Sequence, residues 1–81
     1  MAKSFHLSIA HVAETVFDGE ALSVTLPGEG GELTVLAGHE ALVTPLRAGT
    51  IHYETASGEK GQVAIERGIL EVSGTEATVL L

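Results

Sequence analysis

The chain has 81 residues and no cysteine, with four basic and eleven acidic side chains and a formal net charge of −7. This length allows one small domain covering residues 1–81, and the lack of cysteine excludes disulfides, thiolate metal ligands and a cysteine nucleophile. Because Lys3, Arg47, Lys60 and Arg67 are scattered singly, we expect no nucleic-acid partner and no attraction to an anionic membrane. No apolar run is long enough to span a bilayer, so no direct lipid insertion is expected either.

Short runs in which apolar and polar residues alternate follow one another along the chain, a pattern typical of β-strands. In chain order, the alternating apolar residues are Phe5, Leu7 and Ile9; Leu22, Val24 and Leu26; Leu33 and Val35; Ile51 and Tyr53; Val63 and Ile65; Leu70 and Val72; and the apolar segment 77–81. Glycines separate these runs, and the segments 56–61 and 74–75 are typical of hairpin turns.

Each of these runs would give a strand with one apolar face, which must be covered by another element. Two sheets packed face to face cover all of these faces at once. We therefore predict an all-β fold, a flattened antiparallel β-sandwich of about eight to ten short strands in two sheets, with no helix.

The sequence contains no pattern typical of a catalytic, metal or nucleotide site. Its histidines include no His-x-His pair, whereas a catalytic zinc site needs three converging ligands, and no serine lies in a Gly-x-Ser-x-Gly elbow. The stretch Gly28-Glu29-Gly30-Gly31 lacks the lysine and the following helix of a phosphate-binding loop. We therefore expect no enzymatic activity and no cofactor, metal ion or bound nucleotide.

The middle of the chain carries the most specific motif. Residues 30–49 read Gly-Gly-Glu-Leu-Thr-Val-Leu-Ala-Gly-His-Glu-Ala-Leu-Val-Thr-Pro-Leu-Arg-Ala-Gly. This block resembles the N-terminal domain of the epsilon subunit of F-type ATP synthases, where alanines 37, 41 and 48 of this chain are commonly proline. The blocks 5–7, 16–19 and 68–72 match the same family in order and approximate spacing, so the resemblance covers practically the whole chain.

The resemblance implies a non-catalytic rotor subunit of the central stalk. Such a domain clasps the gamma subunit and rests on the polar loops of the membrane c-ring, so that proton-driven rotation reaches the catalytic subunits of the wider F1Fo complex. It implies a peripheral position on the cytoplasmic face of the inner, energy-transducing membrane. Since the chain ends where the family's two-helix C-terminal domain begins, we expect neither that domain nor helix-based inhibition of ATP hydrolysis.

The resemblance also assigns two sets of contact residues. The expected c-ring contacts are Glu29, Gly31, Glu32, His39 and Glu40. Carboxylates there would complement the arginine that the family's ring loops carry. The expected gamma contacts are Thr44, Leu46, Arg47, Gly49, Gly68 and Ile69. For the two apolar members of the second set, packing in the core is the favoured interpretation.

The alternative function is a free-standing β-sandwich recognition module that binds a carbohydrate or a peptide. Such a module would need exposed aromatic side chains against which its ligand could stack. The chain offers only Phe5, Phe17 and Tyr53, and the first two are predicted to lie in the core.

Overall fold

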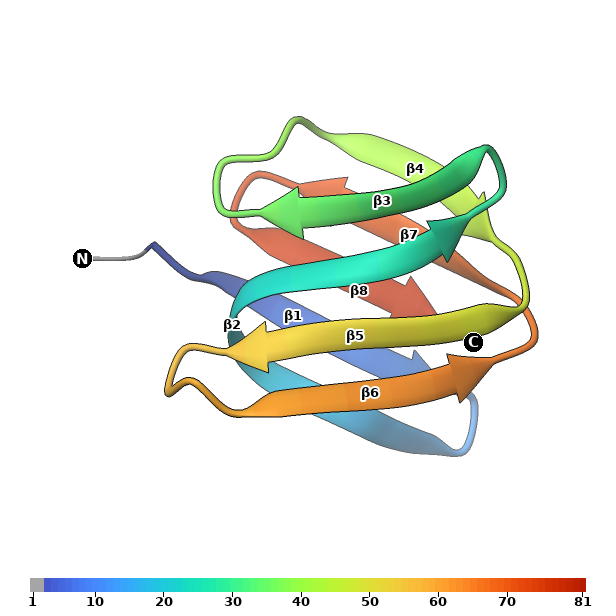
Figure 1. The fold of residues 1–81 in the computed structure, drawn as a ribbon, viewed down its shortest axis with the longest axis horizontal. Coiled ribbons are helices and arrows are strands. Elements are labelled where there is room, and N and C mark those ends of the chain that lie inside the picture. The colour runs from blue at the N-terminus through green and yellow to red at the C-terminus, as the bar shows by residue number, and fades with distance from the viewer. Residues whose placement is uncertain (1–2) are drawn as a thin grey trace.

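The computed structural model describes residues 3–81, which form eight β-strands and contain no helix (Figure 1). The strands are β1 (Phe5–His11), β2 (Glu14–Gly28), β3 (Gly31–Leu36), β4 (Leu42–Leu46), β5 (Gly49–Thr55), β6 (Lys60–Ile65), β7 (Gly68–Ser73) and β8 (Glu76–Leu80). None of the described residues belongs to a helix that could cross a membrane. The predicted all-β fold class is confirmed.

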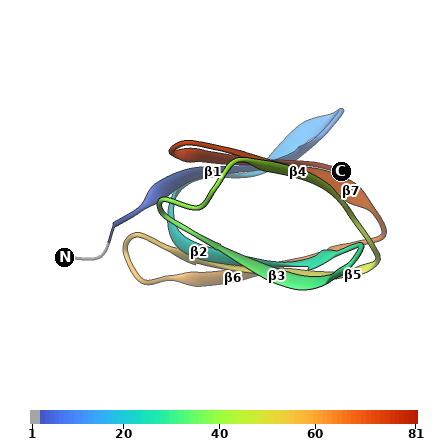
Figure 2. The ribbon, with the colours of Figure 1, turned by 90° about the horizontal axis from the view of Figure 1, so that it is seen from above.

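The strands lie in two layers that pack face to face (Figure 2). A five-strand layer has the order β4, β7, β8, β1 and the first half of β2, and a four-strand layer has the order β3, the second half of β2, β5 and β6. Strand β2 is 15 residues long and passes from one layer to the other. The layers together form the predicted sandwich.

One strand pair differs from the predicted antiparallel pattern. Strands β1 and β8 run parallel, with His6 opposite Glu76 and Ala10 opposite Leu80, whereas the other strand pairs are antiparallel. No hairpin joins β1 to β8, so no turn forces them to run in opposite directions. The alternation of apolar residues is the same for either direction and could not distinguish them.

The core fills the space between the layers because successive side chains of a strand point to opposite faces. The buried apolar residues are Phe5, Leu7, Ile9, Ala21, Val24, Leu26, Val35, Leu46, Ile51, Ile65, Leu70, Val72, Ala77 and Val79. Within residues 3–81 no polar or charged residue is buried. Phe17 and Tyr53 close one side of this core, with ring centroids 4.4 Å apart.

Strand β2 departs from the predicted alternation near its middle. The pattern placed Leu22 on the same face as Val24, but the structure buries Ala21 and leaves Leu22 half-buried. The register between β2 and β5 shifts between Ala21 and Ser23. An extra residue in a strand moves the residues before it to the other face, and here it lies where β2 leaves β1 and begins to pair with β3.

The connections between strands gather at two opposite ends of the sandwich (Figure 1). The C-terminal end holds Leu81 together with the connections 12–13, 29–30, 47–48 and 66–67. The N-terminal end holds the connections 37–41, 56–59 and 74–75. The predicted hairpin turns at the second end are confirmed, and Gly58 and Gly74 supply their positive φ angles of 94° and 55°.

Candidate interaction surfaces

The expected c-ring residues lie along strand β3 but not in one compact site. Glu29, Gly31 and Glu32 are at the β2–β3 hairpin, and His39 and Glu40 are in the connection 37–41. These two groups are at opposite ends of β3, about 20 Å apart for a strand of this length. Within residues 3–81, strand β3 pairs with β2 and with no other strand, so both groups border one edge of the four-strand layer.

Two of these residues have a structural role of their own. Gly31 has a φ of 134°, which favours glycine, and completes the hairpin. The Nδ1 atom of His39 lies 2.9 Å from the carbonyl oxygen of Glu40. Since that oxygen can only accept, Nδ1 is the donor. By contrast, the carboxylates of Glu29, Glu32 and Glu40 are exposed and form no ion pair with any residue of the range 3–81.

The expected gamma residues cluster toward the C-terminal end of the sandwich, where β4 ends and where β5 and β7 begin (Figure 1). The two apolar residues of this set differ in burial. Leu46 lies in the core, as the favoured interpretation predicted, whereas the side chain of Ile69 is 50% exposed. The core interpretation is thus wrong for Ile69. Arg47 is exposed, and its backbone N–H donates to the carbonyl oxygen of Pro27. Thr44 is half-buried.

Close packing accounts for the two glycines of this set. A β-carbon on Gly68 would lie 2.9 Å from the carbonyl oxygen of Leu80, and one on Gly49 would lie 3.0 Å from the side chain of Pro27. Real β-carbons rarely approach other atoms so closely. These positions therefore require glycine for the approach of neighbouring strands, whatever they contact outside the chain.

An apolar groove opens at this end of the sandwich, with a volume of about 450 Å³. It is lined by Pro45, Leu46, Arg67, Gly68, Ile69, Leu80 and Leu81. The expected gamma residues Leu46, Gly68 and Ile69 thus share one concave surface. Leu46 contributes to its buried floor and Ile69 to its exposed wall.

The sequence interpretation missed two exposed apolar residues near this groove. Leu80 is 58% exposed and Val43 is 67% exposed, on the outer face of the five-strand layer. The sequence does contain a signal for them. Leu80 directly follows the buried Val79, and Val43 directly follows the half-buried Leu42. Consecutive apolar residues in a strand place apolar side chains on both of its faces.

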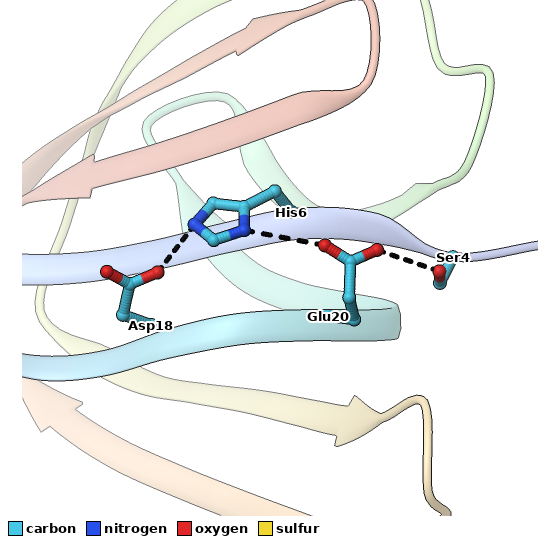
Figure 3. Close-up of polar contacts among 4 residues, drawn as sticks. All are labelled: Ser4, His6, Asp18 and Glu20. Atoms are coloured by element: carbon cyan, nitrogen blue, oxygen red, sulfur yellow. Dashed lines mark hydrogen bonds and ion pairs between the residues drawn. The ribbon is translucent and has the colours of Figure 1, made fainter.

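A polar network on the same outer face was also not predicted. His6 on β1 lies between two carboxylates of β2, with its Nε2 atom 2.5 Å from Asp18 and its Nδ1 atom 3.4 Å from Glu20 (Figure 3). The hydroxyl of Ser4 donates to the other oxygen of Glu20 at 2.9 Å. These contacts hold Asp18 and Glu20 to β1. Within residues 3–81 no group of three histidine, aspartate or glutamate side chains is placed to hold a metal ion.

The fold and these surfaces define a small β-sandwich domain with an exposed apolar patch beside acidic side chains, as in a surface that contacts another protein. Comparison with protein families gives a more specific result. The family described as "ATP synthase, Delta/Epsilon chain, beta-sandwich domain" matches residues 4–81. The chain belongs to this family, and the resemblance found in the sequence is confirmed.

Two of the solved structures with a similar fold are of mitochondrial ATP synthases. A chain of the Euglena gracilis enzyme, in a structure of OSCP, F1 and the c-ring, matches with a TM-score of 0.88 and 26% identity over 95% of this chain. This chain spans 49% of that longer chain. A chain from the central stalk and c-ring of Tetrahymena thermophila matches with a TM-score of 0.77 at 14% identity, over 96% of this chain and 63% of the other. The second likeness shows the fold alone.

Proposed function

We propose that this chain is a central-stalk subunit of an F-type ATP synthase, where it couples the gamma subunit to the c-ring. The observation that carries the proposal is the family match over residues 4–81, nearly the whole chain. The close-packed sandwich core suits this role because such an interior transmits strain. In this proposal the chain performs no chemistry, and residues 3–81 contain no helix that could inhibit ATP hydrolysis.

The ring would meet the β3 edge of the four-strand layer. Exposed carboxylates of Glu29 and Glu32 lie at one end of this edge and that of Glu40 lies near His39 at the other. The negative charge at either end of this edge would attract the arginine expected in the ring loops. In this proposal the chain lies peripherally on the cytoplasmic face of the energy-transducing membrane, close to the ring.

The gamma subunit would contact the C-terminal end of the sandwich. The apolar groove there is bordered by Ile69 and Arg67, and Arg47 and Thr44 belong to the adjacent β4 region. The two proposed surfaces adjoin at this end, because Glu29 and Glu32 lie beside the groove and the backbone N–H of Glu29 donates to the carbonyl oxygen of Pro45. In the proposal one rigid domain holds both partners on neighbouring surfaces.

The alternative of a carbohydrate- or peptide-binding module gains no support. Phe5 is buried, and the half-buried Phe17 and Tyr53 pack against each other. None of these rings is free to stack on a ligand.

A bridging experiment tests the proposed function. Purified gamma subunit and detergent-solubilised c-ring are passed through a sizing column with and without this chain, and each pair is also run separately as a control. We expect the chain to co-elute with each partner and to raise the amount of gamma that elutes with the ring. If the chain elutes free of both partners, the proposal is wrong.

A further inference from the structure

His6 lies among three carboxylates on the outer face of the five-strand layer. The strand register places Glu20 of β2 directly opposite it on one side and Glu76 of β8 directly opposite it on the other. Asp18 lies two residues from Glu20 on β2, opposite Ser8. Within residues 3–81 no lysine or arginine forms an ion pair with any of these carboxylates. His6 is therefore the side chain placed to supply positive charge to this part of the face.

Both ring nitrogens of His6 face a carboxylate (Figure 3). The Nε2 atom lies 2.5 Å from Oδ1 of Asp18, and the Nδ1 atom lies 3.4 Å from Oε2 of Glu20. A carboxylate oxygen can only accept, and a neutral imidazole carries a proton on only one of its nitrogens. The neutral ring would thus turn a lone pair toward one carboxylate, whereas the charged ring presents an N–H to each. The arrangement fits the charged ring.

His11, at the end of the same strand, makes a different contact. Its Nε2 atom lies 3.1 Å from Oε1 of Glu14, and within residues 3–81 no second carboxylate lies within ion-pair distance of its ring. A neutral ring with its proton on Nε2 can donate to Glu14 as the charged ring does. The side chains of His6 and His11 are similarly exposed, at 41% and 39%. His11 therefore provides a matched comparison with one carboxylate in place of two.

The carboxylates that face His6 belong to a strand at the edge of its layer. Residues 14–20 of β2 pair with β1 and with no other strand in the described part of the chain. A segment that is paired on one side only has few contacts that keep it closed, so it can open locally. Through Asp18 and Glu20, His6 adds side-chain contacts between this segment and β1 to those of the backbone.

We propose that His6 is a pH-sensitive link that holds the segment 14–20 to β1 when its ring is protonated. Histidine is the side chain that ordinarily changes charge between pH 5 and 8. The folded chain holds carboxylates against the ring and the unfolded chain does not, so the folded state binds this proton more tightly. Stability is therefore expected to fall as the pH rises through this range. The inference goes beyond the proposed function and does not depend on it.

Urea unfolding of the purified chain at pH 6 and at pH 8 tests the inference. The variant His6→Gln keeps a polar side chain that cannot be charged, and His11→Gln is the matched control. We expect the unfolding midpoint of wild type to rise by roughly 0.5 M more than that of His6→Gln between pH 8 and pH 6, and His11→Gln to keep most of this rise. High salt should reduce the difference, because the side chains involved are partly exposed.

Hydrogen exchange locates the effect in the chain. Between pH 8 and pH 6, after correction for the chemical exchange rate, the protection of amides 14–20 in wild type should increase about threefold relative to amides 60–65. The segment 60–65 is β6, an edge strand of the other layer. Circular dichroism verifies that each variant is folded.

Three results would overturn the inference. The first is the same pH dependence in His6→Gln as in wild type. The second is an equal loss of pH dependence in His11→Gln, because one carboxylate would then act as strongly as two. The third is a change in midpoint without the larger change in protection at 14–20. None of these results bears on the proposed function, because the chain is measured without partners.

Discussion

Replacing Leu70 by alanine is expected to lower the free energy of unfolding by about 3 kcal/mol. Leu70 is completely buried on β7, which lies between β4 and β8 in the five-strand layer. The substitution removes apolar contacts and leaves a cavity that the surrounding strands fill only in part. A domain of this size has a total stability of only about 4–12 kcal/mol, so the variant should unfold at a much lower urea concentration.

The matched control is Leu36→Ala, at a leucine of the same size that is 55% exposed on β3. Its cost should be below about 0.5 kcal/mol, because surface substitutions leave no cavity. Both variants are compared with wild type by urea unfolding followed by circular dichroism. Equal losses of stability in the two variants would contradict the assignment of Leu70 to the core and Leu36 to the surface.

Reversing the charge of Glu32 is expected to weaken binding to the c-ring by roughly tenfold or more at low salt. Glu32 is exposed near the start of β3, at the C-terminal end of the sandwich, and Glu29 lies in the hairpin just before it. A lysine there replaces an attraction to arginine by a repulsion. Because exposed charges are screened by salt, the loss should become smaller as the ionic strength rises.

Glu59→Lys provides the control for this charge reversal. Glu59 is exposed in the connection between β5 and β6, and β6 is the opposite edge of the same layer. The two variants have the same net charge, so any non-specific effect of charge on ring binding is shared. Equal affinity of wild type and Glu32→Lys for the ring across the salt series would exclude an electrostatic contact at Glu32.

Much of the fold could be predicted from the sequence because alternating runs such as Phe5, Leu7 and Ile9 fix which residues are buried. The direction of β8 relative to β1 could not be predicted, since alternation is blind to direction. Nor does alternation reveal the shift between Ala21 and Ser23, because a single extra residue leaves no signal in a run that contains both small and apolar side chains.

The arrangement of the candidate surfaces could be predicted less completely from the sequence. The segment 42–46 reads Leu-Val-Thr-Pro-Leu, and this mixture does not show which of its residues face the core. The separation of Glu32 from His39, in contrast, follows directly from the strand predicted between them. The sequence alone does not distinguish Glu71 and Glu76 from the other carboxylates on the outer face of the five-strand layer. The strand pairing is needed to show that Asp18 and Glu20 are engaged with His6, whereas Glu71 and Glu76 have no ion pair within residues 3–81.

The central claim is that this chain makes rotation of gamma and rotation of the c-ring a single motion. ATP-driven proton pumping in membrane vesicles depleted of the chain tests that claim most directly, with ATP hydrolysis measured in the same vesicles. The account predicts that depleted vesicles hydrolyse ATP without pumping and that purified wild-type chain restores pumping. Full pumping in vesicles that lack the chain would contradict it.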